Sequence, residues 1–291
     1  MERFIAGLID VFAETPLTGN PLAVVEGADA LPDEQLRGIA REFNQAETTF
    51  IMRSSRADRK LRSFTASGAE VFGAGHNALG AWLWMAEHGN LGMLEAPQVF
   101  LQEIGADVLP ITLERRRGQI HGRMTQSPLK LSDPFTAIAP LADALTLRVQ
   151  DIYTTPAPRV ADTGAGHLQV RIRDSETVDR ARPSAEKLLE VLRAAGAEGC
   201  YIYAFDSDAP ARAYARFFNP TVGLWEDAAT GTAAGPLCAY LGSLGMLDAD
   251  NALVVEQGAL MGRRSALHVR LGPDPELSGS GIVVMRGEMV L

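Results

Sequence analysis

The chain has 291 residues, of which 46% are hydrophobic and 22% are charged, so it is long enough for two globular domains. Its formal net charge of −9 argues against nucleic acid and anionic membranes as partners, because both favour a basic face. No apolar run of about 18 residues and no signal-peptide pattern occurs, which predicts a cytoplasmic protein without a membrane span. Only Cys200 and Cys238 are present, far from any paired histidine, so neither a disulfide framework nor a metal site is expected.

Hydrophobic alternation and turn residues organise the first half of the chain. Acidic residues after Pro32 favour a helix there, and a strongly apolar run after a glycine-rich loop predicts a helix that is buried on most sides and closed by Gly89. The remaining alternating stretches predict strands. We expect strands at 4–12, 22–26, 49–52, 61–65, 98–102, 108–114 and 119–125, and helices at 32–43 and 76–88.

The second half repeats the same order of elements. Aligning Glu70 with Glu226 brings Gly75 onto Gly231, although few other residues are identical. A duplicated unit of roughly 150 residues predicts an α/β (α+β) fold of two pseudo-symmetric domains with ligands bound between them. We expect strands at 168–172, 200–205 and 211–218, helices at 184–194 and 232–247, and domains at 1–127 and 128–291.

Two matched helix starts are candidate anion sites. They are Gly75-His76-Asn77 and Gly231-Thr232-Ala233. A glycine before a helix allows close approach of a ligand, and the first-turn N–H groups have no partner within the helix. Tight helix packing is the simpler explanation of either glycine alone, but the occurrence at two equivalent places favours binding of a small carboxylate.

Glu47 lies where the predicted helix at 32–43 gives way to an apolar strand. A glutamate in such a position is usually a solvated surface charge, whereas one held in a pocket can act as a base.

Other sequence motifs are weaker evidence for a function. The stretch from Gly73 to Ala78 fits a dinucleotide fingerprint only superficially, and no P-loop or nucleophile elbow is present, so no cofactor is expected.

Five blocks of the sequence together resemble the phenazine-biosynthesis PhzF family, which has the diaminopimelate-epimerase-like fold. The resemblance runs from about residue 9 to 265 and is most specific in "NQAETTF" and "EDAATGTAAGPL". It implies two similar α/β domains, each with a mostly antiparallel sheet around a central helix and the active site between them. The blocks are "DVFAETPLTGNPLAVV", "IAREFNQAETTF", "GAGHNALGA", "EDAATGTAAGPL" and "EQGALMGRRS".

The resemblance also implies a reaction and roles for residues. The family resembles a one-base isomerase, free of cofactors, that acts on trans-2,3-dihydro-3-hydroxyanthranilate. It implies Glu47 as the proton-shuttling acid/base, His76 and Asp227 as its catalytic companions and a cleft-lining Asn20. With the helix starts, the expected substrate-binding residues are Asn20, Gly75, Asn77, Gly231 and Thr232.

Racemases of this fold resemble each other in using two opposed cysteines, one ahead of each helix-start glycine. Here Ala74 and Thr230 hold those positions, so two-base racemisation is not expected. Asn77 and Thr232 depart from the residues that the family usually shows, which leaves the substrate open. Epimerisation or tautomerisation of another small carboxylate, a catalytically silent binding protein on the same fold and a homodimer all stay open as alternatives.

Overall fold

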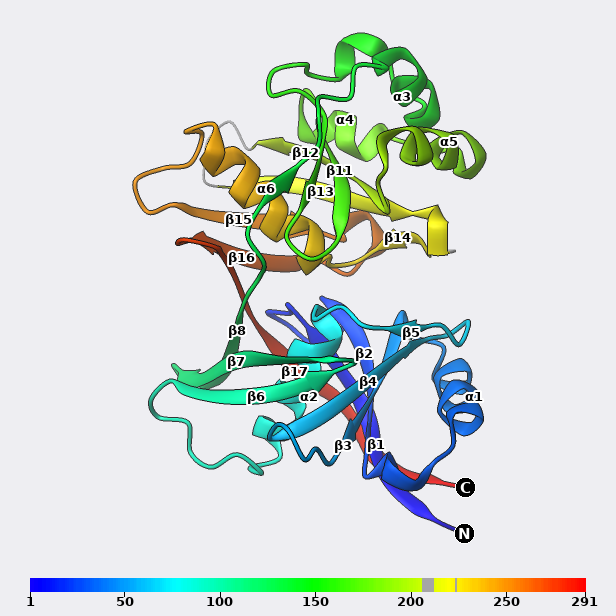
Figure 1. Cartoon of the computed structure of the whole chain (residues 1–291), viewed down its shortest axis with the longest axis vertical. Coiled ribbons are helices and arrows are strands. Elements are labelled where there is room, and N and C mark those ends of the chain that lie inside the picture. Colours follow the sequence, from blue (N-terminus) through cyan, green and yellow to red (C-terminus); the bar gives the residue numbers. More distant parts are fainter. Residues whose placement is uncertain (206–211, 223) are drawn as a thin grey trace. The chain divides into compact units, whose positions relative to one another are not determined.

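The computed structural model describes residues 1–205, 212–222 and 224–291, and Figure 1 traces the chain. The chain divides into two compact units, Met1–Thr125 with Ser278–Leu291, and Gln126–Leu277. The predicted division at 127/128 placed the whole C-terminal segment in the second half. The structure differs because β17 (Pro275–Val290) pairs antiparallel along β1 (Arg3–Val11), so most of the last strand belongs to the first unit.

The first unit is built around the buried helix α2 (His76–Glu87), which contacts strands β1, β2, β3, β4 and β8 of the same unit (Figure 1). Every residue of α2 from His76 to Ala86 is buried, as the apolar run predicted. Helix α1 (Asp33–Phe43) packs on β3 and β4 instead, with one apolar stripe directed inward. The other elements are β2 (Asn20–Glu26), η1 (Ala28–Ala30), β3 (Glu47–Met52), β4 (Arg59–Thr65), β5 (Glu70–Val71), β6 (Gln98–Ile104), β7 (Asp107–Arg116) and β8 (Gln119–Thr125).

The second unit is built in the same way around α6 (Gly231–Ser243), which contacts β10, β11, β15 and β16. Helices α3 (Ile138–Leu145) and α5 (Ala185–Ala195) pack on each other over a separate apolar core. The other elements are β9 (Lys130–Leu131), η2 (Val149–Asp151), β10 (Arg159–Asp162), β11 (Gly166–Arg171), α4 (Ser175–Arg180), β12 (Gly199–Phe205), β13 (Arg212–Asn219), η3 (Pro220–Val222), β14 (Leu224–Asp227), β15 (Ala252–Gln257), η4 (Ala259–Met261) and β16 (Ser265–Leu271).

Strand pairing confirms the duplication that the glycine spacing predicted. In the first unit β1–β2 is antiparallel, β2–β3 parallel, β3–β4 antiparallel, β4–β6 parallel and β6–β7 antiparallel. The series β10–β11, β11–β12, β12–β13, β13–β15 and β15–β16 repeats these directions one by one in the second unit. The fold is therefore α/β with two pseudo-symmetric units, each enclosing a central helix.

An arginine–glutamate pair stands at the same place in both units. Arg62 of β4 donates from Nε and Nη2 to the two carboxylate oxygens of Glu70, at 2.7 and 2.8 Å. Arg216 of β13 holds Glu226 in the same way, with both bonds at 2.8 Å. Each glutamate lies five residues before a helix-start glycine, so the clamp fixes the chain that leads into the central helix.

Most predicted elements are present, with shifted ends. Strand β3 begins at Glu47 and not at residue 49, because Glu47 already pairs with Leu22 on one side and Thr65 on the other. Helices α3 and α4 and the strands β5, β9, β10 and β14 to β17 were not predicted. The strand predicted at 211–218 begins at Ala211, which lies outside the described residues, and its described part matches β13.

Candidate active site

Glu47 and His76 meet at the first helix start. Glu47 is the first residue of β3, a strand paired on both sides, and His76 is the first residue of α2. Oε2 of Glu47 lies 3.8 Å from Nε2 of His76, and the two side chains are only 17% and 10% exposed. The solvated surface charge is therefore not what the structure shows for Glu47.

His76 is a neutral imidazole. Burial lowers its pKa to about 4, because the charged form loses its hydration, so the ring carries no proton charge near neutral pH. Its Nε2 atom is buried and has no hydrogen-bond partner among the described residues. The ring can thus offer a neutral hydrogen bond to a ligand beside the Glu47 carboxylate, and the predicted catalytic role of His76 stays a prediction.

Asn77 organises the loop in front of α2. Its Nδ2 donates to Oγ of Ser63 and to the carbonyl oxygen of Gly73, at 3.1 and 3.0 Å, and its Oδ1 accepts the N–H of Gly75 at 2.8 Å. Both amide donors are therefore engaged within the protein. The predicted contact of Asn77 with substrate has only a carbonyl lone pair left to use.

Asn20 begins β2 and is buried, opposite Val11 of β1. The turn that delivers it depends on Gly19, whose φ is +69° and where a Cβ would lie 2.4 Å from the carbonyl oxygen of Val11. Only glycine fits this position without strain. The structure thus explains the glycine of the quoted Gly-Asn-Pro turn, and the contact of Asn20 with substrate stays a prediction.

Asp227 lies in the second unit, at the end of β14, in a buried hydrogen-bond network. Thr230 donates its hydroxyl to Oδ2 of Asp227 at 2.6 Å, and Gln257 donates to the Asp227 carbonyl oxygen at 2.7 Å and to the Thr230 hydroxyl at 3.0 Å. Oε1 of Gln257 accepts from the Thr230 N–H and from the hydroxyl of Tyr201. Gln257 belongs to the quoted block "EQGALMGRRS", but its residue type alone did not mark it as the centre of this network.

The second helix start presents Gly231 and Thr232. The carbonyl oxygen of Gly231 accepts from Nε2 of Gln126 at 2.9 Å, and the hydroxyl of Thr232 lies 3.1 Å from Nε2 of His167. Gly235, one turn into α6, makes room for the Gln126 side chain, since a Cβ there would meet Oε1 of Gln126 at 1.6 Å and displace it. The helix start is thereby held from two sides.

The positions ahead of the two glycines carry no thiol. Ala74 and Thr230 occupy them, and the hydroxyl of Thr230 is committed to Asp227. Both cysteines are buried elsewhere, and burial raises the pKa of each thiol to about 12. Cys200 and Cys238 therefore stay thiols at neutral pH and serve as small core residues.

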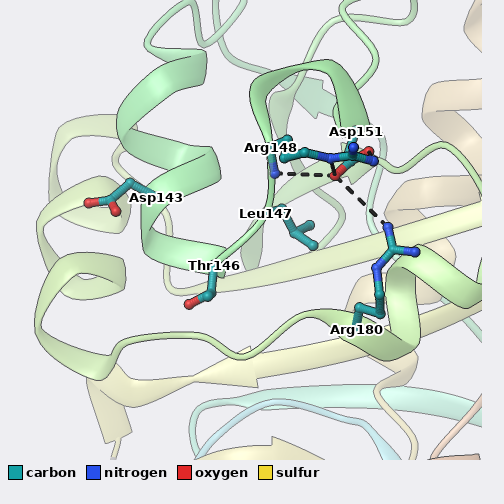
Figure 2. A pocket seen from close by; sticks show the side chains of 6 residues that line it. All are labelled: Asp143, Thr146, Leu147, Arg148, Asp151 and Arg180. Atoms are coloured by element: carbon teal, nitrogen blue, oxygen red, sulfur yellow. Dashed lines mark hydrogen bonds and ion pairs between the residues drawn. The ribbon is translucent and has the colours of Figure 1, made fainter.

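A pocket of about 540 Å³ in the second unit is lined by none of the predicted site residues, and Figure 2 shows the side chains that line it. Buried Asp151 forms its charged centre and is paired with Arg148, Arg173 and Arg180 at 3.0, 3.2 and 4.0 Å. The hydrogen bond from Arg148 holds the pKa of Asp151 below its usual range, so the carboxylate is charged. These groups satisfy one another and join η2 to α4, so we assign the pocket no ligand.

No group of three or more histidine, cysteine, aspartate or glutamate side chains stands close enough to hold a metal ion in the described part of the chain. Among the helices of residues 1–205, 212–222 and 224–291, none has the length and apolar composition needed to span a membrane.

Two matched units, each around a central helix, are the architecture of the diaminopimelate-epimerase-like fold. A hydroxyproline epimerase from Agrobacterium vitis shares the fold with a TM-score of 0.69 at 14% identity, covering 99% of this chain and 91% of that one. The chain itself belongs to the PhzC-PhzF family of phenazine biosynthesis-like proteins, which it matches over residues 9–290.

Individual relatives agree with this assignment. The chain is 30% identical over 292 residues to the trans-2,3-dihydro-3-hydroxyanthranilate isomerase of Pseudomonas fluorescens, covering 98% of both sequences. It also resembles the crystal structure of a PhzF-family phenazine biosynthesis protein from Bacillus anthracis, with a TM-score of 0.89, 25% identity and full coverage of both chains. The protein is therefore an isomerase of the PhzF type.

Proposed function

We propose that this isomerase moves a proton within a small cyclic carboxylic acid, such as trans-2,3-dihydro-3-hydroxyanthranilate, with Glu47 as its single acid/base. The Glu47 carboxylate removes a proton from one ring carbon, and the C–H electron pair shifts into the adjacent π system. The resulting carboxylic acid then returns the same proton to a second carbon. Substrate and product have the same atoms and oxidation level, so the reaction needs no cofactor.

The environment of Glu47 is the observation that carries this proposal. A carboxylate that is 17% exposed, held by a strand paired on both sides and 3.8 Å from a neutral histidine, is suited to meet a ring carbon in a fixed geometry. The unpartnered Nε2 of His76 supplies a hydrogen bond for a substrate hydroxyl or amine. His76 would thus orient the substrate while Glu47 moves the proton.

A single base is favoured over the two-base alternative. Epimerisation with inversion needs a second acid/base on the opposite face of the substrate, and Ala74 and Thr230 stand where thiols would supply such a pair. The hydroxyl of Thr230 is already a donor to Asp227. Asp227 itself is proposed to hold a polar group of the substrate.

The test is Glu47→Gln assayed with trans-2,3-dihydro-3-hydroxyanthranilate. Glutamine keeps the shape of the side chain but cannot carry the proton, so kcat should fall at least about 100-fold. The melting temperature and the affinity for anthranilate, a non-reacting carboxylate, should change little. Exposed Glu42→Gln, in α1, is the matched control and should retain full activity. Turnover by Glu47→Gln within a few fold of the wild type would refute the proposal.

A further inference from the structure

His167 is a buried histidine that the proposed reaction does not use. It is the second residue of β11 and is 3% exposed. Its Nε2 lies 3.1 Å from the hydroxyl oxygen of Thr232, in the first turn of α6. A buried imidazole in contact with a predicted ligand-binding hydroxyl can determine whether that hydroxyl donates or accepts a hydrogen bond.

The ring of His167 is held by packing. Phe217 of β13 meets it edge to face, with ring centroids 4.9 Å apart. Gly199, the strand partner of His167 on β12, makes the room for this ring, since a Cβ there would approach Phe217 to 2.5 Å. The orientation of the imidazole is therefore fixed by its surroundings as well as by its hydrogen bond.

The two nitrogens of His167 are unequally satisfied. Nδ1 is buried and has no hydrogen-bond partner among the described residues, whereas Nε2 contacts Thr232. An unpaired buried N–H is rarer and less favourable than an unpaired lone pair. The proton therefore belongs on Nε2, and Nδ1 keeps its lone pair. Burial also lowers the pKa of this histidine to about 4, against the opposing effect of Asp162, so the neutral form is maintained.

A donor at Nε2 determines the direction of the Thr232 hydroxyl. The hydroxyl oxygen accepts the Nε2–H, so the hydroxyl proton has to be donated elsewhere, and no acceptor for it occurs among the hydrogen bonds of the described residues. The group stands in the first turn of α6, beside the N–H of Gly231. A carboxylate is the acceptor that fits this donor at a helix N-terminus.

We propose that His167 is a positioning residue that donates Nε2–H to Thr232 and thereby presents the Thr232 hydroxyl as a donor to the carboxylate of the substrate. The inference rests on the proposed function, because it supplies the carboxylate recognition of the same reaction. It adds to that function a specific hydrogen bond, from the Thr232 hydroxyl of the second unit to the substrate carboxylate.

The first test is the tautomer of His167 in the wild-type protein without ligand. Two-dimensional ¹H–¹⁵N NMR optimised for long-range histidine couplings distinguishes Nε2–H from Nδ1–H. His167 is identified by the loss of its signals in His167→Gln or by through-space contacts to the Phe217 ring. We expect the Nε2–H form, and the Nδ1–H form would overturn the inference whatever the activity of Glu47→Gln.

The second test is a double-mutant cycle with trans-2,3-dihydro-3-hydroxyanthranilate. Thr232→Val and His167→Phe should each raise KM about 10-fold, the scale of a lost hydrogen bond to a charged group, with smaller effects on kcat. His167→Gln keeps a donor near the position of Nε2 and should recover KM to within about threefold of the wild type. In the Thr232→Val background, His167→Phe should change KM less than about twofold.

A purely structural role for His167 predicts a different pattern. Its effects would then add to those of Thr232→Val, lower the melting temperature in proportion and show no recovery with glutamine. That pattern would overturn the inference. Failure of the proposed function would instead appear as an active Glu47→Gln enzyme, with the tautomer result unaffected.

Discussion

The starts of α2 and α6 have the same backbone plan and different side chains. Both follow a bidentate arginine–glutamate clamp, and both arginines also lie over a phenylalanine ring two residues further along the strand, at 5.1 and 4.8 Å. These rings, Phe64 and Phe218, pair across the strands with Thr48 and Cys200. Glu47 directly precedes Thr48 in the first unit, and Gly199 directly precedes Cys200 in the second. The duplicated fold therefore keeps the carboxylate at only one of two equivalent positions.

The difference separates what the fold needs from what the chemistry needs. The clamp recurs in both units because it fixes the entry to each central helix. The carboxylate occurs once, and Gly199 provides the space in which Phe217 supports His167. We propose that the first unit serves proton transfer through Glu47 and that the second orients the Thr232 hydroxyl, an asymmetry that fits a one-base isomerase.

The largest expected effect on stability comes from breaking the clamp in the second unit. The Arg216 side chain is 6% exposed and also donates to the carbonyl oxygens of Val178 and Ala181, whereas Arg62 is 20% exposed. Arg216→Met should lower the free energy of unfolding by about 3–5 kcal/mol, because it leaves Glu226 buried without its partner. Arg62→Met should lower it by only about 1 kcal/mol. Equal losses in chemical denaturation would show that the two clamps do not differ in this way.

The second prediction concerns pH, because each helix start has one buried neutral histidine. The pKa of His76 and of His167 is about 4 in the folded protein, against 6.5 for an unperturbed side chain. Between these values the unfolded state binds more protons, so the free energy of unfolding should fall as the pH falls from about 6.5 to 4. Each histidine contributes a slope of up to about 1.4 kcal/mol per pH unit, and stability is unaffected by either above that window.

Urea denaturation from pH 7 to 4.5 measures this slope. His76→Gln and His167→Gln should each reduce it. Asp174, whose pKa is lowered to about 2, changes the free energy of unfolding only below this window. An unchanged slope in both buried-histidine variants would contradict the neutral state assigned to them.

A smaller effect is expected from adding one methyl group to the second unit. In Gly199→Ala the added Cβ would lie 2.5 and 2.8 Å from two ring carbons of Phe217, so the ring has to move. Overpacking of this kind should lower the free energy of unfolding by about 1–3 kcal/mol and raise KM through His167, with kcat nearly retained. Gly38→Ala, where no atom lies within 4 Å of the added Cβ, is the control. A KM equal to that of the wild type in a folded Gly199→Ala enzyme would remove the proposed link from Gly199 to Thr232.

Local patterns predicted the central helices and the duplication, because apolar runs and glycine starts are properties of neighbouring residues. The apolar run after Gly75 gave α2 within one residue of its observed end. The return of β17 to β1 was missed, since pairing between Arg3 and Val290 depends on contacts across nearly the whole chain. Helix α3 was missed because Pro140 lies in its first turn, where a proline is tolerated but reads as a helix breaker.

In the site, too, local sequence blocks identified residues but did not predict the contacts between distant segments. Glu47 and His76 were proposed as site residues from the blocks that resemble the PhzF family, and the structure brings them within 3.8 Å of each other. The engagement of both Asn77 donors by Ser63 and Gly73 could not be predicted, because it depends on how the loop folds over β4. The equivalence of Gly199 to Glu47 depends on strand register, which no single sequence displays.

The central claim is that one carboxylate carries one proton from carbon to carbon. The direct measurement is a single turnover of trans-2,3-dihydro-3-hydroxyanthranilate that carries deuterium at the carbon that loses its proton, with the product examined by NMR and mass spectrometry. A Glu47 shuttle predicts that a substantial part of the deuterium appears at the receiving carbon on the same face of the ring, and that this transfer is lost in Glu47→Gln. Complete replacement by solvent hydrogen on the opposite face, or undiminished transfer in Glu47→Gln, would contradict it.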